Sequence, residues 1–367
     1  MTVIQRRRLL LSGAAAAVLP SMSLPLAAQE RRFEPRPGTW RTFEITTRAE
    51  IPVSSGVARV WLPVPSVDDS YQKTGSHAYK TNGAATFGSD GKYGARFLQV
   101  EFPESQATPF VELTSRFETQ DRATDWAKKG APALAAADLA AWLQPTDLMP
   151  LDGIVLRTAS DATRGATTDV EKVRKIYDWV VANTYREPKV RGCGTGDIKT
   201  MLETGNMGGK CGDINGLFVG LCRSVGIPAR DVYGIRMVPS AFGYRELSGN
   251  PANLKSAQHC RAEVYLKGYG WVAMDPADVG KVMRLETAEW IKTTVNPVVA
   301  PVNKALFGGW EGNWLAFNQA HDVALPGAKA GKLGFFMYPT AEDAKGRFDS
   351  LDPDNFKYTI TGREIKA

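Results

Sequence analysis

Residues 208–237, GGKCGDINGLFVGLCRSVGIPARDVYGIRM, contain the change of pattern that decides the fold. A glycine-rich loop gives way at Cys211 to a run that predicts an amphipathic helix, closed by Gly226 and Pro228. Its apolar positions are Ile214, Leu217, Phe218, Leu221 and Val225. A helix N-terminus carries partial positive charge, which stabilises a thiolate. The pattern therefore favours a nucleophilic thiol at Cys211 over a buried structural cysteine.

A second stretch, residues 259–281 (HCRAEVYLKGYGWVAMDPADVGK), supplies a base and an acid. His259 begins a predicted strand, and Asp275 ends the next strand, after one tight turn. An acid beside an imidazole fixes its tautomer and favours the imidazolium. Cys211, His259 and Asp275, in this order, predict a triad for thiol-based acyl transfer. A hydrogen-bonded strand histidine and a strand-end acid are the alternative interpretations of the last two.

The turn between these strands sets the direction of the two side chains. If residue 266 pairs with residue 271, His259 and Asp275 point to opposite faces, because side chains alternate along a strand. The two side chains must share one face to interact. We therefore predict a bulge or a wider turn between Ala262 and Met274 that restores the phase.

Both stretches resemble the nucleophile helix and the His and Asp strands of transglutaminase-like proteins, over roughly residues 168–282. The resemblance implies an α+β, papain-like fold in which the Cys helix packs on an antiparallel sheet. It implies Cys211 as nucleophile, His259 as general base and Asp275 as its orienting partner. One departure is that Cys260 and Arg261 stand where the family often has an aromatic residue after the histidine. Family members include cross-linking enzymes, proteases, amidases and inactive homologues.

Two functions follow as hypotheses. The first is an exported thiol enzyme that acts on amide or peptide bonds of a protein or peptide through a Cys thioester, as hydrolase or acyltransferase. The second is a catalytically silent binding or assembly protein with the same fold. We interpret Asp213 and Glu263 as structural, and Asn206 as a turn residue rather than an oxyanion donor. Trp271 is a core residue unless it lines the cleft.

The rest of the chain divides into segments that differ in composition and in polarity pattern. Residues 35–122 alternate in polarity and predict a small antiparallel β-domain, with a loop or hairpin at 75–95. Residues 123–166 are expected to be a helical linker, with a helix over 133–143. Residues 167–295 form the expected catalytic core, opened by a capping box at residues 168–171. Residues 296–367 are aromatic and irregular, and we expect them to pack on the core.

Residues 1–28 have the pattern of a cleaved signal peptide of the twin-arginine type, which predicts a periplasmic protein. Removing its three arginines and no acidic residue lowers the formal charge from +6 to +3. That charge is too small to indicate nucleic-acid binding. No further stretch is apolar enough to predict insertion in a membrane. No metal, nucleotide or flavin signature is present, so we expect no cofactor.

Four cysteines in an oxidising compartment require an explanation. Cys211 must stay free to react, and the neighbours of Cys222 suggest a core position. Cys193 lies in the glycine loop, and Cys260 follows His259 on its strand, with its side chain expected on the opposite face. We predict a Cys193–Cys260 disulfide, with two reduced, buried thiols as the alternative.

Overall fold

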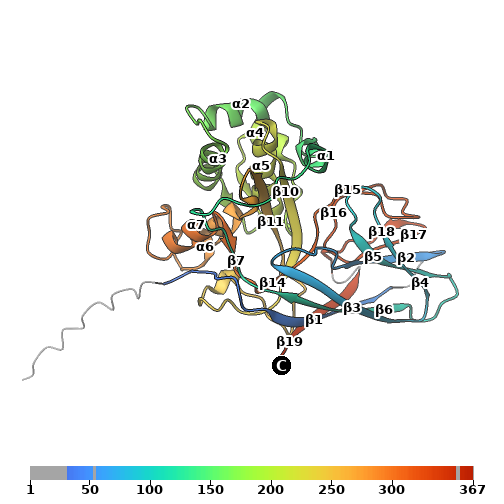
Figure 1. Ribbon diagram of the computed structural model, residues 1–367. Helices are drawn as coiled ribbons and strands as arrows, with labels where there is room; N and C mark the ends of the chain where they lie inside the picture. The colour runs from blue at the N-terminus through green and yellow to red at the C-terminus, as the bar shows by residue number, and fades with distance from the viewer. Residues whose placement is uncertain (1–30, 53–54, 353–355, 367) are drawn as a thin grey trace, which may run out of the picture. The chain divides into compact units, whose positions relative to one another are not determined.

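Antiparallel sheets organise the chain in the computed structural model, which describes residues 31–52, 55–352 and 356–366 (Figure 1). The signal peptide expected at residues 1–28 lies outside the described residues. One sheet consists of β19 (Lys357–Ile365), β1 (Arg41–Glu50), β6 (Phe110–Thr119) and β3 (Gln72–Thr81), in this order. Burial alternates along β1 and β6, which confirms the half-buried strands predicted there.

A second sheet completes the β-rich region at the front of the chain. It consists of β18 (Gly346–Arg347), β17 (Thr340–Asp343), β2 (Ala58–Val64), β5 (Arg96–Phe102) and β4 (Ala84–Ser89), in this order. Of residues 75–95, predicted as a loop or hairpin, residues 75–81 instead lie in β3 and residues 84–89 in β4, which pair in different sheets, while residues 90–95 form a turn. Both strands are largely exposed, so their polar composition reads as loop.

The sheet that carries the predicted site has the order β12 (Gly270–Met274), β11 (Gln258–Leu266), β10 (Ala229–Arg236) and β14 (Trp314–Asn318). Helix α5 (Cys211–Ser224) packs against β10 and β11. Four other helices pack against α5: α2 (Gly153–Ala162), α3 (Asp169–Asn183), α4 (Ile198–Thr204) and α6 (Pro276–Leu285). This arrangement confirms the α+β class with the Cys helix on an antiparallel sheet (Figure 1).

Helix α5 is buried on nearly all its faces rather than on one side. Glycine explains the difference from the predicted amphipathic helix. A Cβ on Gly220 would lie 2.3 Å from the Ile198 side chain and 3.0 Å from Met149, so neighbouring segments approach the helix backbone closely there. The predicted amphipathic helix rested on the large apolar residues alone, so it left out the face on which glycines allow close packing.

Shorter elements connect these layers. They are α1 (Ala136–Ala140), η1 (Ala141–Leu143), η2 (Arg245–Leu247), α7 (Ala300–Ala305), β7 (Arg122–Ala123), β8 (Tyr185–Arg186), β9 (Gly208–Gly209), β13 (Gly309–Trp310), β15 (His321–Val323) and β16 (Leu333–Phe335). The helix expected over 133–143 is thus a single short α-helix followed by a 3₁₀ turn. The predicted capping box at Thr168 and Glu171 is present at the start of α3. Among the described residues, no helix combines the length and the apolar character needed to cross a bilayer.

The C-terminal segment was expected to be irregular, and it is not. β14 adds an edge to the site sheet, β17 pairs with β2, and β19 pairs with β1 over residues 357–365. The segment therefore belongs to both the front sheets and the core, and residues Arg31–Ala367 cluster as one compact unit. The domain boundaries proposed from the sequence remain a prediction.

Candidate active site

Cys211 is the first residue of α5, and the preceding loop is fixed to the helix by Asp213. One carboxylate oxygen of Asp213 accepts hydrogen bonds from the backbone N–H groups of Thr195 and Gly196, each 2.9 Å. The other oxygen accepts from the Lys210 N–H at 2.9 Å. Asp213 thus caps the helix and holds the loop, which confirms its structural interpretation.

His259 and Asp275 lie on the same face and are hydrogen-bonded. His259 Nε2 is 2.8 Å from Asp275 Oδ2, and both side chains are buried. The predicted bulge or wider turn is wrong, however. The β11–β12 ladder is regular, and residue 266 pairs with residue 270 across a three-residue turn. This turn is one residue tighter than the pairing of 266 with 271, and the shift of one residue restores the phase.

Asp275 also begins α6, where its side chain accepts the backbone N–H of Asp278 at 3.1 Å. Asn215, four residues after Cys211 and so one helical turn on, donates to Asp275 Oδ1 at 3.1 Å. The amide oxygen of Asn215 accepts the Ala277 N–H at 3.2 Å. The orienting acid is therefore fixed from the nucleophile helix as well as from its own helix.

Asp278 is a second carboxylate on the imidazole that sequence reasoning missed. Its Oδ2 lies 3.3 Å from His259 Nε2, and its Oδ1 accepts from Arg236 at 2.5 Å. The available signal was its place in the first turn of a helix that begins at Asp275, because residues three apart are neighbours there. Arg261 stands 3.6 Å from the Asp275 carboxylate, so the residue found in place of the family's aromatic contributes charge to the site.

The pKa shifts favour an ion pair between thiol and imidazole. Burial and a nearby guanidinium lower the pKa of His259, but Asp278 and Asp275 outweigh them and raise it to about 9. Burial raises the pKa of the Cys211 thiol, but hydrogen bonds from two neighbouring thiols and from the imidazolium outweigh burial and hold it well below its usual range. Cys211 thiolate and His259 imidazolium are therefore the favoured states near neutral pH.

The two neighbouring thiols belong to Cys193 and Cys260. The sulfurs of Cys193, Cys211 and Cys260 all lie within 4.8 Å of one another, and all three residues are buried. The predicted Cys193–Cys260 disulfide is not formed, since both residues are free thiols, as is Cys222 in the core. The sulfur of Cys260, whose side chain was expected on the opposite face of the strand from the imidazole, lies within 4.8 Å of the Cys211 sulfur.

A groove of about 490 Å³ ends at Cys193. One wall is the loop that leads to the nucleophile, and the other belongs to the C-terminal segment. The lining residues include Leu148, Thr195, Leu333, Phe335, Tyr338, Phe348 and Leu351. Phe335 also lies beside Gly212, where an added Cβ would stand 3.7 Å from its ring. The groove therefore reaches the immediate neighbourhood of Cys211, which is itself only 2% exposed.

Residues 157–276 match the family model described as the transglutaminase-like superfamily. These residues form a transglutaminase-like domain. The match spans every element that supplies the Cys, His and Asp of the site.

Three other proteins are similar to this chain. An uncharacterized protein of Haemophilus influenzae is 34% identical over 345 residues, which cover 88% of this chain and 91% of that protein. The crystal structure of a proposed cysteine protease from Cytophaga hutchinsonii has a TM-score of 0.50 at 17% identity and covers 89% of this chain and 99% of its own. The periplasmic domain of TgpA from Pseudomonas aeruginosa has a TM-score of 0.35 at 15% identity, over 72% of this chain and 93% of its own.

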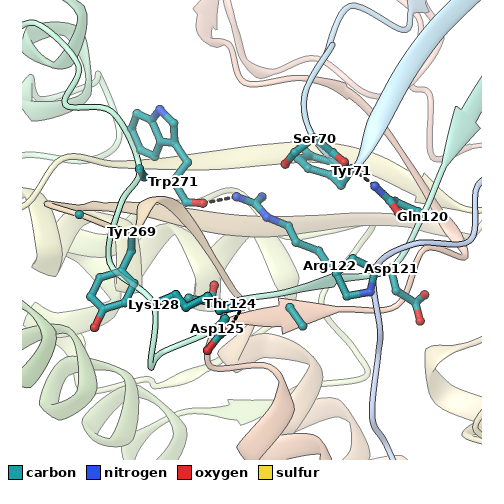
Figure 2. A pocket seen from close by; sticks show the side chains of 14 residues that line it. Ser70, Tyr71, Gln120, Asp121, Arg122, Thr124, Asp125, Lys128, Tyr269 and Trp271 are labelled. Atoms are coloured by element: carbon teal, nitrogen blue, oxygen red, sulfur yellow. Dashed lines mark hydrogen bonds and ion pairs between the residues drawn. The ribbon is translucent and has the colours of Figure 1, made fainter.

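Trp271 does not line the groove of this transglutaminase-like site. It borders a separate cavity of about 370 Å³, whose other lining residues include Tyr71, Arg122, Asp125 and Tyr269 (Figure 2). There Arg122 donates to the Trp271 carbonyl and to Glu263, which also accepts from Arg230 at 2.5 Å. Glu263 therefore holds two arginines and does not contact the imidazole, as its structural interpretation predicts.

Asn206 and His321 have structural partners. Asn206 accepts the Gly208 N–H at 3.4 Å, consistent with a turn residue. His321 contacts Asp231 at 3.4 Å and the Tyr233 hydroxyl at 3.2 Å, in a buried cluster. Among the residues that the structure describes, two groups of buried side chains are close enough to ligate one ion, the three cysteines above and His259 with Asp275 and Asp278. In the second group the arginine contacts already supply positive charge to the carboxylates.

Proposed function

We propose that this protein is a cysteine-nucleophile hydrolase or acyltransferase that acts on amide or peptide bonds through a Cys211 thioester. The observation that carries the proposal is the buried His259–Asp275 pair at 2.8 Å, placed beside a thiol whose pKa it helps to lower. Nucleophile, base and orienting acid then have the roles that a thiol acyl-transfer site requires.

The first step is attack of the Cys211 thiolate on the carbonyl carbon of the substrate. Cys211 is the first residue of α5, so its backbone N–H has no acceptor within the helix. That N–H can donate to the oxyanion as it forms, supported by the positive end of the helix. Removing one such donor costs roughly 10²- to 10³-fold in turnover in comparable sites.

The second step is departure of the amine. His259, held as imidazolium by Asp275 and Asp278, donates its proton to the leaving nitrogen and becomes neutral. The acyl group stays on Cys211 as a thioester. Neutral His259 then removes a proton from water, or from an acceptor amine, which attacks the thioester and frees the thiol.

The groove beside Cys193 is the approach for the acyl substrate. Its walls combine apolar side chains with the polar loop at Thr195, which suits an extended peptide segment with an apolar side chain near the scissile bond. The proposed substrate is a protein or peptide. The proposed location is the periplasm, which rests on the signal-like pattern of residues 1–28 alone.

The test is to trap the acyl-enzyme. The full mature chain is mixed with a peptide library in the presence of a labelled primary amine, quenched in acid and examined by intact-mass and peptide mass spectrometry. The proposal predicts an acyl adduct on Cys211. Release as free acid or as labelled amide distinguishes hydrolase from acyltransferase.

The matched controls are two cysteines of one helix. Cys211→Ala must lose the adduct, whereas Cys222→Ala, which removes a buried thiol further along α5, must keep it. An unmodified wild-type protein with every peptide offered, together with no cleavage or transfer product, would support the catalytically silent binding protein instead.

A further inference from the structure

Cys193 and Cys260 have no defined role in the mechanism, although their sulfurs lie within 4.8 Å of the nucleophilic sulfur of Cys211. They come from different elements: Cys193 from the loop before α4 and Cys260 from the middle of the site sheet. All three sulfurs lie within 4.8 Å of one another, whereas a disulfide bond is about 2.05 Å long, so a bond between any two of them requires a shift of the residues that carry them. Which pair forms depends on which backbone can move.

The backbone of Cys193 is the more adaptable of the two. It is flanked by Gly192 at φ +54° and Gly194 at φ +87°, in a loop without regular structure. Cys260 lies within β11 and pairs with Tyr233 of β10, and its carbonyl accepts a hydrogen bond from the Asn215 side chain at 2.9 Å, so its backbone is held in place. The backbone of Cys193 also lies beside the start of the nucleophile helix, because the Cys193 carbonyl accepts the Gly212 N–H at 2.8 Å.

Access and reactivity point to the same pair. Cys193 lines the groove, so a reagent that enters the groove meets this part of the cluster first. Cys211 is the sulfur with the thiolate character, since the pKa values of Cys193 and Cys260 are both raised. A thiolate that attacks an external disulfide there has a neutral thiol within reach to resolve the product.

We propose that Cys211 and Cys193 form a reversible redox site, in which a disulfide reagent converts the nucleophile into an internal Cys211–Cys193 disulfide. In the first step the Cys211 thiolate attacks a disulfide R–S–S–R, forming Cys211–S–S–R and releasing R–S⁻. In the second step Cys193 gives its proton to R–S⁻ and attacks Cys211, which releases the second R–S⁻. That thiolate takes the proton held by His259. The two protein thiols are oxidised and the reagent is reduced to two thiols.

The disulfide shuts the site off and protects it from irreversible oxidation, because no thiolate remains to be oxidised further. A dithiol reductant restores both thiols. Formation of the bond needs only the thiol cluster, whereas the loss of turnover rests on the proposed function of Cys211.

The experiment treats the reduced full mature chain with oxidised glutathione and maps its disulfides by mass spectrometry without reductant. The expected product is a Cys193–Cys211 linked peptide pair with no retained glutathione, reversed by dithiothreitol. In Cys193→Ser, Cys211 should instead keep glutathione as a stable mixed disulfide. Cys260→Ser and the control Cys222→Ala should still give the Cys193–Cys211 link.

Any other pattern overturns the inference. A Cys193–Cys260 link with Cys211 free, a stable glutathione adduct on wild-type Cys211, or no reaction at the cluster each contradicts it. Turnover of a peptide substrate is measured on the same samples. A Cys193–Cys211 link in a protein that is inactive when fully reduced would leave the redox site standing and reject the proposed function.

Discussion

At the scale of single residues, His259 is the central group of the proposed mechanism, in which it must keep its proton until the amine departs. The carboxylates of Asp278 and Asp275 overcome burial and raise its pKa to about 9. The ordinary histidine pKa is about 6.5. Since the folded-state pKa is the higher one, the stabilisation from protonating His259 is fully present below about 6.5 and is lost as the pH rises through about 9.

The first prediction concerns Asp275→Asn. It keeps the shape but removes one charge that raises the pKa of His259, so turnover should fall by roughly 10²- to 10⁴-fold. The alkaline limb of the rate profile should also move to lower pH. Rates of peptide turnover measured across pH test both effects. A variant with lower turnover but an unmoved alkaline limb would show that Asp275 does not act through the imidazole proton.

The second prediction concerns Asp278→Asn, which leaves Arg236 buried without its partner carboxylate. Breaking a buried ion pair on one side costs about 3–5 kcal/mol. The control is Asp178→Asn, which breaks the exposed i,i+4 pair of α3 with Arg174 and should cost about 0.5 kcal/mol or less. Urea unfolding measures both, and equal losses in the two variants would contradict the buried network.

The sequence is enough to predict the Cys, His and Asp of the candidate site, but not the residues that hold them in position. Cys211, His259 and Asp275 stand at element ends with turn signals beside them, so local pattern finds them. Asp278 and Asn215 reach the site because α6 and α5 lie side by side, which is a tertiary contact. Nothing in the sequence around Asn215 distinguishes it from a surface polar residue, and the three-residue spacing of Asp278 from Asp275 is the one local signal for this pair.

At the scale of elements, the loop before α5 depends on glycine for a steric reason. Gly194 has φ +87°, and an added Cβ would stand 1.8 Å from the Asp213 carboxylate that caps the helix. The side chain would therefore separate the loop from α5. Loop, cap and nucleophile form one unit, although Cys193 and Cys211 are 18 positions apart in the sequence.

The third prediction compares two glycines with similar backbone angles. Gly226→Ala, at φ +82° with open space around it, should cost only the left-handed penalty of about 1–2 kcal/mol. Gly194→Ala should cost more, because the carboxylate must move as well, and it should also reduce turnover. Chemical unfolding and peptide turnover are the measurements. If the two variants lost equal stability, Asp213 would not be holding the loop.

The turn between β11 and β12 shows the limit of sequence analysis at this scale. The requirement that His259 and Asp275 share a face is physical and could be stated in advance. The local structure that meets this requirement could not be predicted, because a bulge and a one-residue change of turn length restore the phase equally well. Gly268 at φ +86° and Gly270 at φ +74° allow the tighter turn that the chain uses.

At the scale of the whole molecule, the two ends of the chain share one sheet. β19 pairs with β1 over residues 357–365, and β17, two strands earlier in the chain, joins the second front sheet. These pairings connect residues about three hundred positions apart, and the strands β16–β18 are only two to four residues long. Neither feature leaves a periodic signal, so the aromatic composition of the segment reads as irregular.

The fourth prediction concerns β19. Ending the chain at residue 355 removes Phe356 and Ile360 from the core, each worth about 1.5–3 kcal/mol. It also turns β1 into an exposed edge strand, which favours association. Urea unfolding should therefore show a loss of at least about 3 kcal/mol, and size-exclusion chromatography should show oligomers. A chain that ends at residue 365 is the control, and a truncated protein as stable as this control would contradict the role of β19.

The proposed mechanism depends on Cys211 being a thiolate paired with His259. Alkylation of Cys211 by iodoacetamide, measured as a function of pH, tests this ion pair without any substrate. Peptide mass spectrometry follows each cysteine of the native protein separately. We expect Cys211 to react at pH values well below the ordinary thiol pKa of about 8.5. Buried Cys222, whose pKa is raised by burial, should stay unlabelled. Labelling of Cys211 that rises only near or above the ordinary thiol pKa would contradict the ion pair and the mechanism built on it.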